Sequence, residues 1–232
     1  MDQPGSHWKQ RYRSFYYTHA EVPDLTLDLE RTGLLVIDVQ NIYFSRSDDP
    51  DDPGESGEWA FFRSRMKNVV VPNIVRLTDF FRERRMPVFF ARIACLTADG
   101  SDRSLSQKRA GFNNILLPHN QEASHIIENI KPLENEVVVT KTTDSALTGT
   151  NLRLILQNMG IHHVVVCGIF TDQCVSSTVR SLADESFDTV VIEDACAAGT
   201  EELHNHELEI INNIYCQVLN VEELLEVLEM EL

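Results

Sequence analysis

Short apolar runs alternate along the chain with segments in which apolar side chains recur at helical spacing. Between residues 152 and 159 the apolar positions follow an i, i+3, i+4, i+7 pattern, with Thr150 as a candidate N-cap and Gly160 at the end. The apolar runs occupy residues 34–37, 88–90, 137–139, 164–166, 190–192 and 218–219. Each run has the length of a strand, so the pattern predicts strands and helices in alternation.

Strands that read as continuous apolar runs are covered on both faces, which is typical of parallel sheets between helix layers. We therefore expect an α/β fold, a three-layer α/β/α sandwich with a mainly parallel six-stranded sheet. One domain should span residues 32–232. Residues 1–31 form an aromatic-rich N-terminal arm, which we expect to pack on its own domain or on a neighbouring subunit. Residues 48–58 (DDPDDPGESGE) predict an acidic loop.

Composition excludes several classes of partner. The chain has 36 acidic and 20 basic residues and a net charge of −16, which disfavours attraction to nucleic acid or to an anionic membrane surface. No apolar run is long enough to span a bilayer, and the N-terminus lacks the apolar stretch of a secretory signal, so we expect a cytoplasmic protein. The five cysteines show no Cys-x-x-Cys spacing and predict neither a disulfide framework nor a zinc site.

Three polar residues at the ends of apolar runs are the candidates for chemistry. Asp38 ends the first run, Lys141 follows the third, and Cys174 follows the fourth in the sequence GIFTDQC. Ligands of open α/β sheets bind at the carboxyl ends of the strands, so these three side chains should converge on one edge. Alone, each has an ordinary structural explanation as a turn residue, a solvated lysine or a packed thiol. Cys174 is expected in the first turn of a helix over residues 174–184, where backbone amides favour thiolate.

Three motifs in this order resemble those of the isochorismatase-like cysteine hydrolases, a family that includes several amidohydrolases. The motifs are LLVIDVQN around Asp38, VVVTKTTDSALTGTNLRLIL around Lys141 and VVVCGIFTDQCVSSTVRSLADESFDTVVIEDACAA around Cys174. The resemblance covers about residues 32–219. It implies a catalytic triad of Asp38, Lys141 and Cys174, in which Cys174 attacks a carbonyl and forms an acyl-thioenzyme. It also implies an oxyanion hole made of the backbone N–H groups of Phe170 and Cys174, and a cis peptide at Ile169–Phe170.

The resemblance implies hydrolysis of a C–N bond in a small amide, ureido or lactam substrate. Two alternatives stay open: a vinyl ether hydrolase of the isochorismatase type, which releases pyruvate and needs no thiol, and a catalytically silent binding or scaffolding protein. We expect no cofactor and no metal, because the acidic loop lacks the Asp-x-His pair that metal-binding members carry. A homodimer or homotetramer is also expected.

Four residues near strand ends could line the substrate pocket. They are Gln40, Tyr43, Phe44 and Arg92. An aromatic pair with one arginine would suit a small planar amide or carbamoyl compound that carries an anionic group. Core packing or a surface salt bridge explains each of the four equally well.

Overall fold

The computed structural model describes residues 7–44 and 57–231. The acidic loop predicted for residues 48–58 lies outside the described residues except for its last two positions.

Within these ranges, six strands form one sheet in the order β3-β2-β1-β4-β5-β6, and every pairing is parallel. All six strands coincide with the predicted apolar runs. Their bounds are β1 Thr32–Ile37, β2 Val88–Ile93, β3 Val137–Lys141, β4 His163–Ile169, β5 Asp188–Ala197 and β6 Gln217–Leu219. The predicted parallel α/β architecture is therefore confirmed.

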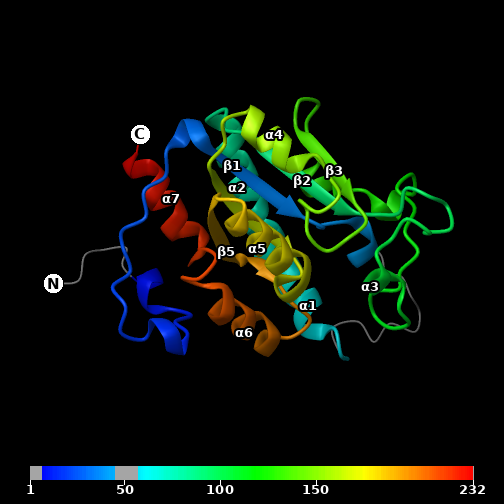
Figure 1. Ribbon diagram of the computed structural model, residues 1–232, viewed down its shortest axis with the longest axis horizontal. Coiled ribbons are helices and arrows are strands. Elements are labelled where there is room, and N and C mark those ends of the chain that lie inside the picture. Colours follow the sequence, from blue (N-terminus) through cyan, green and yellow to red (C-terminus); the bar gives the residue numbers. More distant parts are fainter. Residues whose placement is uncertain (1–6, 45–56, 232) are drawn as a thin grey trace.

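Helices cover both faces of this sheet (Figure 1). The α-helices are α1 Ala60–Arg65, α2 Val71–Glu83, α3 Leu105–Lys108, α4 Leu152–Asn158, α5 Ser176–Asp184, α6 Glu201–Ile211 and α7 Val221–Met230. The chain steps from β1 to β2 in one direction and from β4 to β5 in the other. Right-handed crossovers therefore place α2 on the face opposite α4, α5 and α6. An Arg76–Glu222 contact of 2.7 Å joins α2 to α7.

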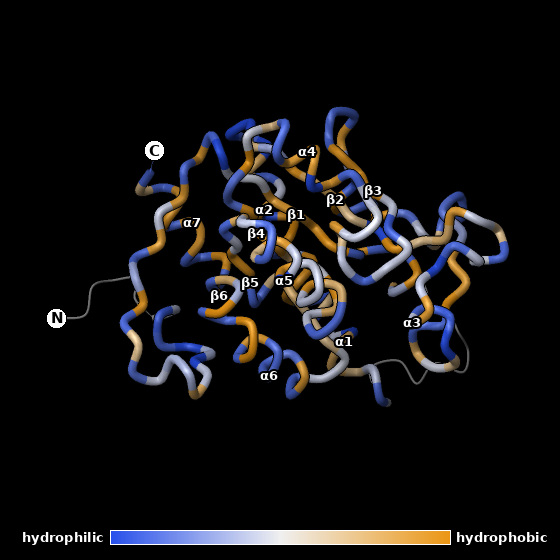
Figure 2. Tube along the Cα trace, viewed as in Figure 1, coloured by the Kyte–Doolittle hydropathy of each residue, from blue (hydrophilic) through white to orange (hydrophobic). Residues whose placement is uncertain are grey.

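The core lies along the central strands. Figure 2 shows these strands largely in orange, the colour of hydrophobic residues. Every residue of β1 is buried, and so is every residue of β4 after His163. Burial on both faces explains why these strands read as unbroken apolar runs rather than as alternating ones. In the part of the chain that the structure describes, no helix is both long and apolar enough to cross a membrane.

Local sequence signals account for several helix ends. Asn220 caps α7 in a capping box with Glu223, and Pro72 lies at the start of α2. Gly160 follows α4 with a φ of 70°, the left-handed conformation that ends many helices. The prediction for Cys174 was wrong in detail. Thr171–Val175 forms a π-helical turn, and α5 begins only at Ser176.

The N-terminal arm packs on its own domain through part of its length. Trp8 is buried in the hydrophobic core. The Nδ2 atom of Asn212 donates to the backbone carbonyls of Arg11 and Tyr12, at 3.1 Å each. The arm's remaining aromatics include Phe15, whose side chain is exposed.

Candidate active site

The three candidate residues meet at the carboxyl edge of the sheet. Asp38 directly follows β1, Lys141 ends β3, and Cys174 lies in the turn after β4. The strand order reverses around β1, so the edge between β1 and β4 is the switch point where open α/β sheets bind ligands. Asp38 has a φ of 55°, a left-handed conformation that few residues other than glycine adopt. Lys141 starts two strands away from Asp38 and reaches it with its long side chain.

Lys141 joins the other two residues through its ammonium group. Its Nζ lies 2.7 Å from Asp38 Oδ2 and 3.3 Å from Cys174 Sγ, and it donates to the Thr143 carbonyl at 3.1 Å. An ammonium group has three N–H donors, so each can be directed to one of these partners. All three predicted catalytic side chains are buried: Asp38 is 2% exposed, Lys141 1% and Cys174 6%.

Burial controls the protonation of the three groups. It raises the pKa of Asp38, and the Lys141 charge and a hydrogen bond with Cys174 oppose that rise. Burial alone would lower the pKa of Lys141, but the charge of Asp38 and the hydrogen bonds with Asp38 and Cys174 outweigh it and raise that pKa. Burial and the Asp38 charge raise the pKa of Cys174 well above its ordinary value, against the effect of Lys141. The raised pKa favours the neutral thiol over the thiolate, so Cys174 needs a base to become a nucleophile.

The turn that carries Cys174 begins with a close approach of two strands. Gly168 pairs with Ile37 and has a φ of 120°, and a Cβ at this position would lie 2.1 Å from the Ile37 carbonyl oxygen. Only glycine fits there. One residue further along, the Ile169–Phe170 peptide bond is cis, as the resemblance implies. The backbone N–H groups of Gln173 and Val175 then donate to the Phe170 carbonyl, at 3.0 and 3.2 Å, and close the turn.

Cys174 lines a small inner cavity of about 40 Å³, which has room for a group of only a few heavy atoms. A neighbouring outer cavity of about 340 Å³ shares part of its wall. The side chains common to both are Tyr43, Phe112, Ile115 and Phe170. A ligand can therefore place its reacting group beside Cys174 and the rest of its body between the aromatic rings.

Of the four predicted pocket residues, only Tyr43 lines the cavity of Cys174. Gln40 donates from Nε2 to the Ile93 and Ser124 carbonyls and accepts from the Ile93 N–H, each at 2.9 Å, so it holds the end of β2. Phe44 lines a separate hollow.

Arg92 also points away from Cys174. Its Nε donates to Thr140 Oγ1 at 3.1 Å, and the side chain lines a hollow elsewhere on the surface. Ile93, the next residue of β2, does line the inner cavity, because successive strand residues face opposite sides of the sheet. The expected anion site built on Arg92 is therefore not beside Cys174.

An aromatic cluster surrounds Phe170 at the outer cavity, and most of it was missed by the sequence reasoning. The ring centroids of Tyr43, Phe62 and Phe112 lie 5.4, 4.9 and 5.5 Å from that of Phe170. Trp59 stacks on Phe112 at 5.3 Å. These rings come from the segments that follow β1, β2 and β4. No local sequence pattern predicts that these segments meet. They give the outer cavity flat apolar walls.

Asp144 is a further polar residue of the inner cavity that the sequence reasoning missed. Its Oδ1 lies 3.8 Å from Cys174 Sγ and accepts a hydrogen bond from Gln107 Nε2 at 2.7 Å. A signal was present, because Asp144 lies only three residues after Lys141, in the loop that leaves the carboxyl end of β3. A carboxylate therefore faces the candidate nucleophile from the side of that loop.

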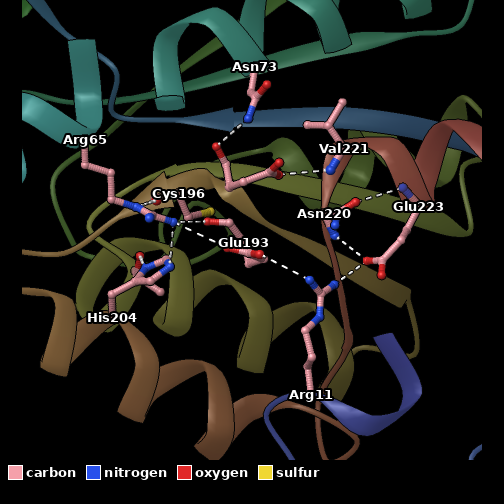
Figure 3. A network of polar contacts seen from close by, with 11 residues as sticks. Arg11, Arg65, Asn73, Glu193, Cys196, His204, Asn220, Val221 and Glu223 are labelled. Carbon is pink, nitrogen blue, oxygen red and sulfur yellow. Dashed lines mark hydrogen bonds and ion pairs between the residues drawn. The ribbon is translucent and has the colours of Figure 1, made fainter. Parts of the chain in front are cut away.

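A part-buried polar network that includes Arg65, His204 and Glu193 (Figure 3) contacts the turn of Cys174 through His204. His204 Nδ1 lies 2.8 Å from Thr171 Oγ1, in the turn itself, and its Nε2 lies 2.9 Å from Arg65 Nη2. Because arginine can only donate, Nε2 must accept and Nδ1 carries the proton. Burial, with the Arg65 charge, lowers the pKa of His204 to about 3. Arg65 also pairs with Glu193, which contacts Arg11 of the N-terminal arm.

Within the described ranges, no three His, Cys, Asp or Glu side chains gather as a group that could hold a metal ion.

The fold and the site define a class of protein: a parallel α/β sandwich in which a cysteine after the fourth strand contacts a buried Asp–Lys pair. The chain belongs to the isochorismatase family, because the model of the isochorismatase domain matches residues 32–223. It is a hydrolase of this family, and amidohydrolases are among its relatives.

Two relatives and one solved structure illustrate the likeness. The uncharacterized isochorismatase family protein YddQ of Bacillus subtilis is 29% identical over 204 residues, which cover 84% of this chain and 98% of YddQ. Ureidoacrylate amidohydrolase RutB of Pantoea ananatis is 28% identical over 186 residues, or 74% of this chain and 72% of RutB. The structure of an isochorismatase family protein from Burkholderia thailandensis is 27% identical, covers 88% of this chain and 98% of its own, and has a TM-score of 0.70.

Proposed function

We propose that the protein is a cysteine hydrolase that cleaves a C–N bond of a small amide, ureido or lactam substrate through an acyl-thioenzyme. The observation that carries the proposal is that Lys141 Nζ contacts both Asp38 and Cys174 Sγ, and that Cys174 lines a cavity. A thiol beside a base and a cation is the arrangement that nucleophilic catalysis by cysteine requires.

The first half of the reaction forms the thioester. Cys174 is a neutral thiol, so it needs a base, and Asp38 can take the proton because burial has raised its pKa. Sγ then forms a bond to the carbonyl carbon, and the oxygen becomes an oxyanion. The backbone N–H groups of Phe170 and Cys174 would bind that oxyanion. Asp38 returns the proton to the nitrogen as the C–N bond breaks and the amine leaves.

The second half restores the enzyme. Asp38 takes a proton from a water molecule, whose oxygen attacks the thioester carbon. The C–S bond breaks, the acid is released, and the proton on Asp38 passes to the Cys174 sulfur. Lys141 stays positively charged throughout, because the carboxylate of Asp38 raises its pKa. Its charge orients Asp38 and offsets the negative charge that moves between Asp38 and Cys174.

The relatives support the same class of reaction. RutB is described as an amidohydrolase of ureidoacrylate, and the described site holds a thiol, which a vinyl ether hydrolase would not need. The small inner cavity fits a reacting group the size of a carboxamide or ureido group. The predicted dimer or tetramer and the cytoplasmic location stay predictions.

The test is ammonia release from a panel of small amides, carbamoyl compounds and ureas. We expect turnover in the wild type and loss of turnover in Cys174→Ala, with an unchanged circular dichroism spectrum. The matched control is Cys95→Ala, because Cys95 is a second buried thiol that lines the same cavity and does not contact the Asp38–Lys141 pair in the described part of the chain. Cys95→Ala should keep wild-type activity within a few fold.

Pyruvate release from isochorismate, measured beside the panel, addresses the first alternative. Pyruvate release that survives Cys174→Ala would replace the thioenzyme mechanism with vinyl ether hydrolysis. Silence of the wild type in both assays would favour the catalytically silent binding protein. Equal ammonia release by the wild type and Cys174→Ala would exclude Cys174 as the nucleophile.

A further inference from the structure

The carboxylate of Asp144 is a charged group on the cavity wall that the proposed mechanism does not use. It lies 3.8 Å from Cys174 Sγ, so a nitrogen bound to it would lie within a few bonds of the carbon that Sγ attacks. Both hydrogen bonds recorded for this carboxylate within the described ranges, from Gln107 and from the thiol, go to Oδ1. A carboxylate has about four acceptor positions on its two oxygens, so capacity remains at Oδ2.

Arg103 is the cation that shares the inner cavity, but its guanidinium holds the surrounding loop together. It donates to the carbonyls of Gly100, Gln107 and Ile115, at 3.3, 3.1 and 3.0 Å, and to Asn114 Oδ1 at 3.2 Å. Four of its five N–H donors are therefore directed at loop acceptors rather than at the cavity. Asp144 is the charged group with more capacity left for a ligand.

The surface next to Asp144 is acidic as well. Asp144 also borders an open hollow of about 430 Å³ that Asp172 and Glu207 line. Glu207 pairs with Arg180 at 2.9 Å, whereas the buried Oδ1 of Asp172 has no hydrogen-bond partner among the described residues. The hollow is therefore lined by three carboxylates and one cation, Arg180, an excess of two carboxylates. With a net charge of −16 for the whole chain, the field favours the approach of a cation.

We propose that the substrate carries a protonated amino group within a few bonds of the scissile carbonyl, and that Asp144 binds this group. The inference rests on the proposed hydrolase function and names its substrate class as cationic amides or ureido compounds. It reverses the expectation of an anionic substrate, which depended on Arg92. Asp144 acts here as a specificity-determining residue: it selects which carbonyl compound reaches Cys174, and the thiol chemistry itself stays with Asp38 and Lys141.

Binding and turnover of three amides of similar size test the proposal at pH 7. The probes are 3-aminopropanamide, which is cationic, butanamide, which is neutral, and malonamate, which is anionic. Binding is measured by calorimetry on Cys174→Ser, alone and combined with Asp144→Asn. Turnover is measured by ammonia release in the wild type and in Asp144→Asn. The matched control is Asp184→Asn, the same change of charge at the far end of α5.

We expect the dissociation constant of 3-aminopropanamide to be about tenfold or more below that of butanamide, with malonamate the weakest. Asp144→Asn should abolish this preference, and Asp184→Asn should keep it. The ratio between probes is the deciding readout, because a loss of nucleophile strength or of folding lowers all three rates together. Equal binding of the three probes, a preference for malonamate, or a cation preference that survives Asp144→Asn would overturn the inference.

The two proposals fail in different ways. Ammonia release that depends on Cys174 but shows no cation preference refutes the substrate class and leaves the hydrolase function intact. Cation-selective binding that depends on Asp144, without Cys174-dependent turnover of any amide or urea, refutes the hydrolase function and keeps Asp144 as a cation-binding residue. Absence of both refutes both.

Discussion

The buried pair of Asp38 and Lys141 makes a quantitative prediction about stability. Both side chains are at most 2% exposed, and their charged atoms are 2.7 Å apart. Removing one partner of such a pair leaves a charge without compensation in a medium that solvates it poorly, at a cost of about 3–5 kcal/mol. We expect Lys141→Met and Asp38→Asn each to lower the free energy of unfolding by about that amount.

The double variant should behave differently from the sum of the two. The single costs add to about 6–10 kcal/mol, but removing both charges leaves none uncompensated, so the double variant should lie within about 2 kcal/mol of the wild type. The assay is unfolding in urea at pH 7, followed by circular dichroism and by tryptophan fluorescence. Coincident transitions from the two probes are the check that unfolding is two-state.

The pH dependence of Lys141→Met gives an internal control. Without the ammonium group the pKa of Asp38, already raised by burial, rises further. A raised carboxyl pKa contributes stability that is present below the unfolded-state pKa and is lost as the pH rises through the folded-state pKa. The deficit of Lys141→Met should therefore be smaller at pH 5 than at pH 8. Additive single costs, or a deficit independent of pH, would refute the interpretation of the pair as a coupled buried ion pair.

Two further predictions concern the frame of the site. Gly168→Ala should lower the free energy of unfolding by about 3 kcal/mol or more, because the new Cβ would lie 2.1 Å from the Ile37 carbonyl oxygen. Gly160→Ala, also at positive φ but in open space, should lower it by about 1–2 kcal/mol. Equal losses of stability in urea unfolding would contradict this reasoning. The pKa of His204 is about 3 in the folded protein, against an ordinary histidine value of 6.5 that applies once the chain unfolds. As the pH falls from about 6 to 4, the free energy of unfolding of the wild type should therefore fall by up to about 1.4 kcal/mol per pH unit relative to that of His204→Gln. If the stabilities of the two proteins change in parallel with pH, this explanation is wrong.

The strands and the three catalytic candidates were predictable for the same physical reason. A parallel strand buried on both faces shows up as an unbroken apolar run, and the first polar residue after such a run marks the sheet edge where ligands bind. Asp38 stands at such a position after β1, and Cys174 follows β4 within a few residues. Lys141 comes one residue after the first polar residue, Thr140, on the partly exposed strand β3. Their mutual contact depends only on strand order, which the right-handed crossovers restrict to few choices.

The pocket walls were less predictable, because they depend on side-chain direction and on long connections. Gln40 follows β1 as closely as Asp38 does, yet its amide is engaged by backbone groups of two other segments. Arg92 and Ile93 are neighbours in β2 and face opposite sides, so the two-residue period could have excluded Arg92 from the cavity. Trp59 and Phe112 reach the cavity from connections whose path no periodic pattern describes.

The charge of the cavity wall also bears on the choice between the two hydrolytic reactions. Isochorismate is a dicarboxylate, and a site for it needs cationic side chains that face the ligand. Beside Cys174 the structure places the carboxylate of Asp144, and the ammonium group of Lys141 there is paired with Asp38. Arg103 donates to acceptors of its own loop, and Arg92 lines a different hollow. The carboxylate of Asp144 repels a second carboxylate beside it, and a cation gains from the same field. The charge beside Cys174 therefore disfavours a dicarboxylate such as isochorismate, and this argument does not depend on the thiol.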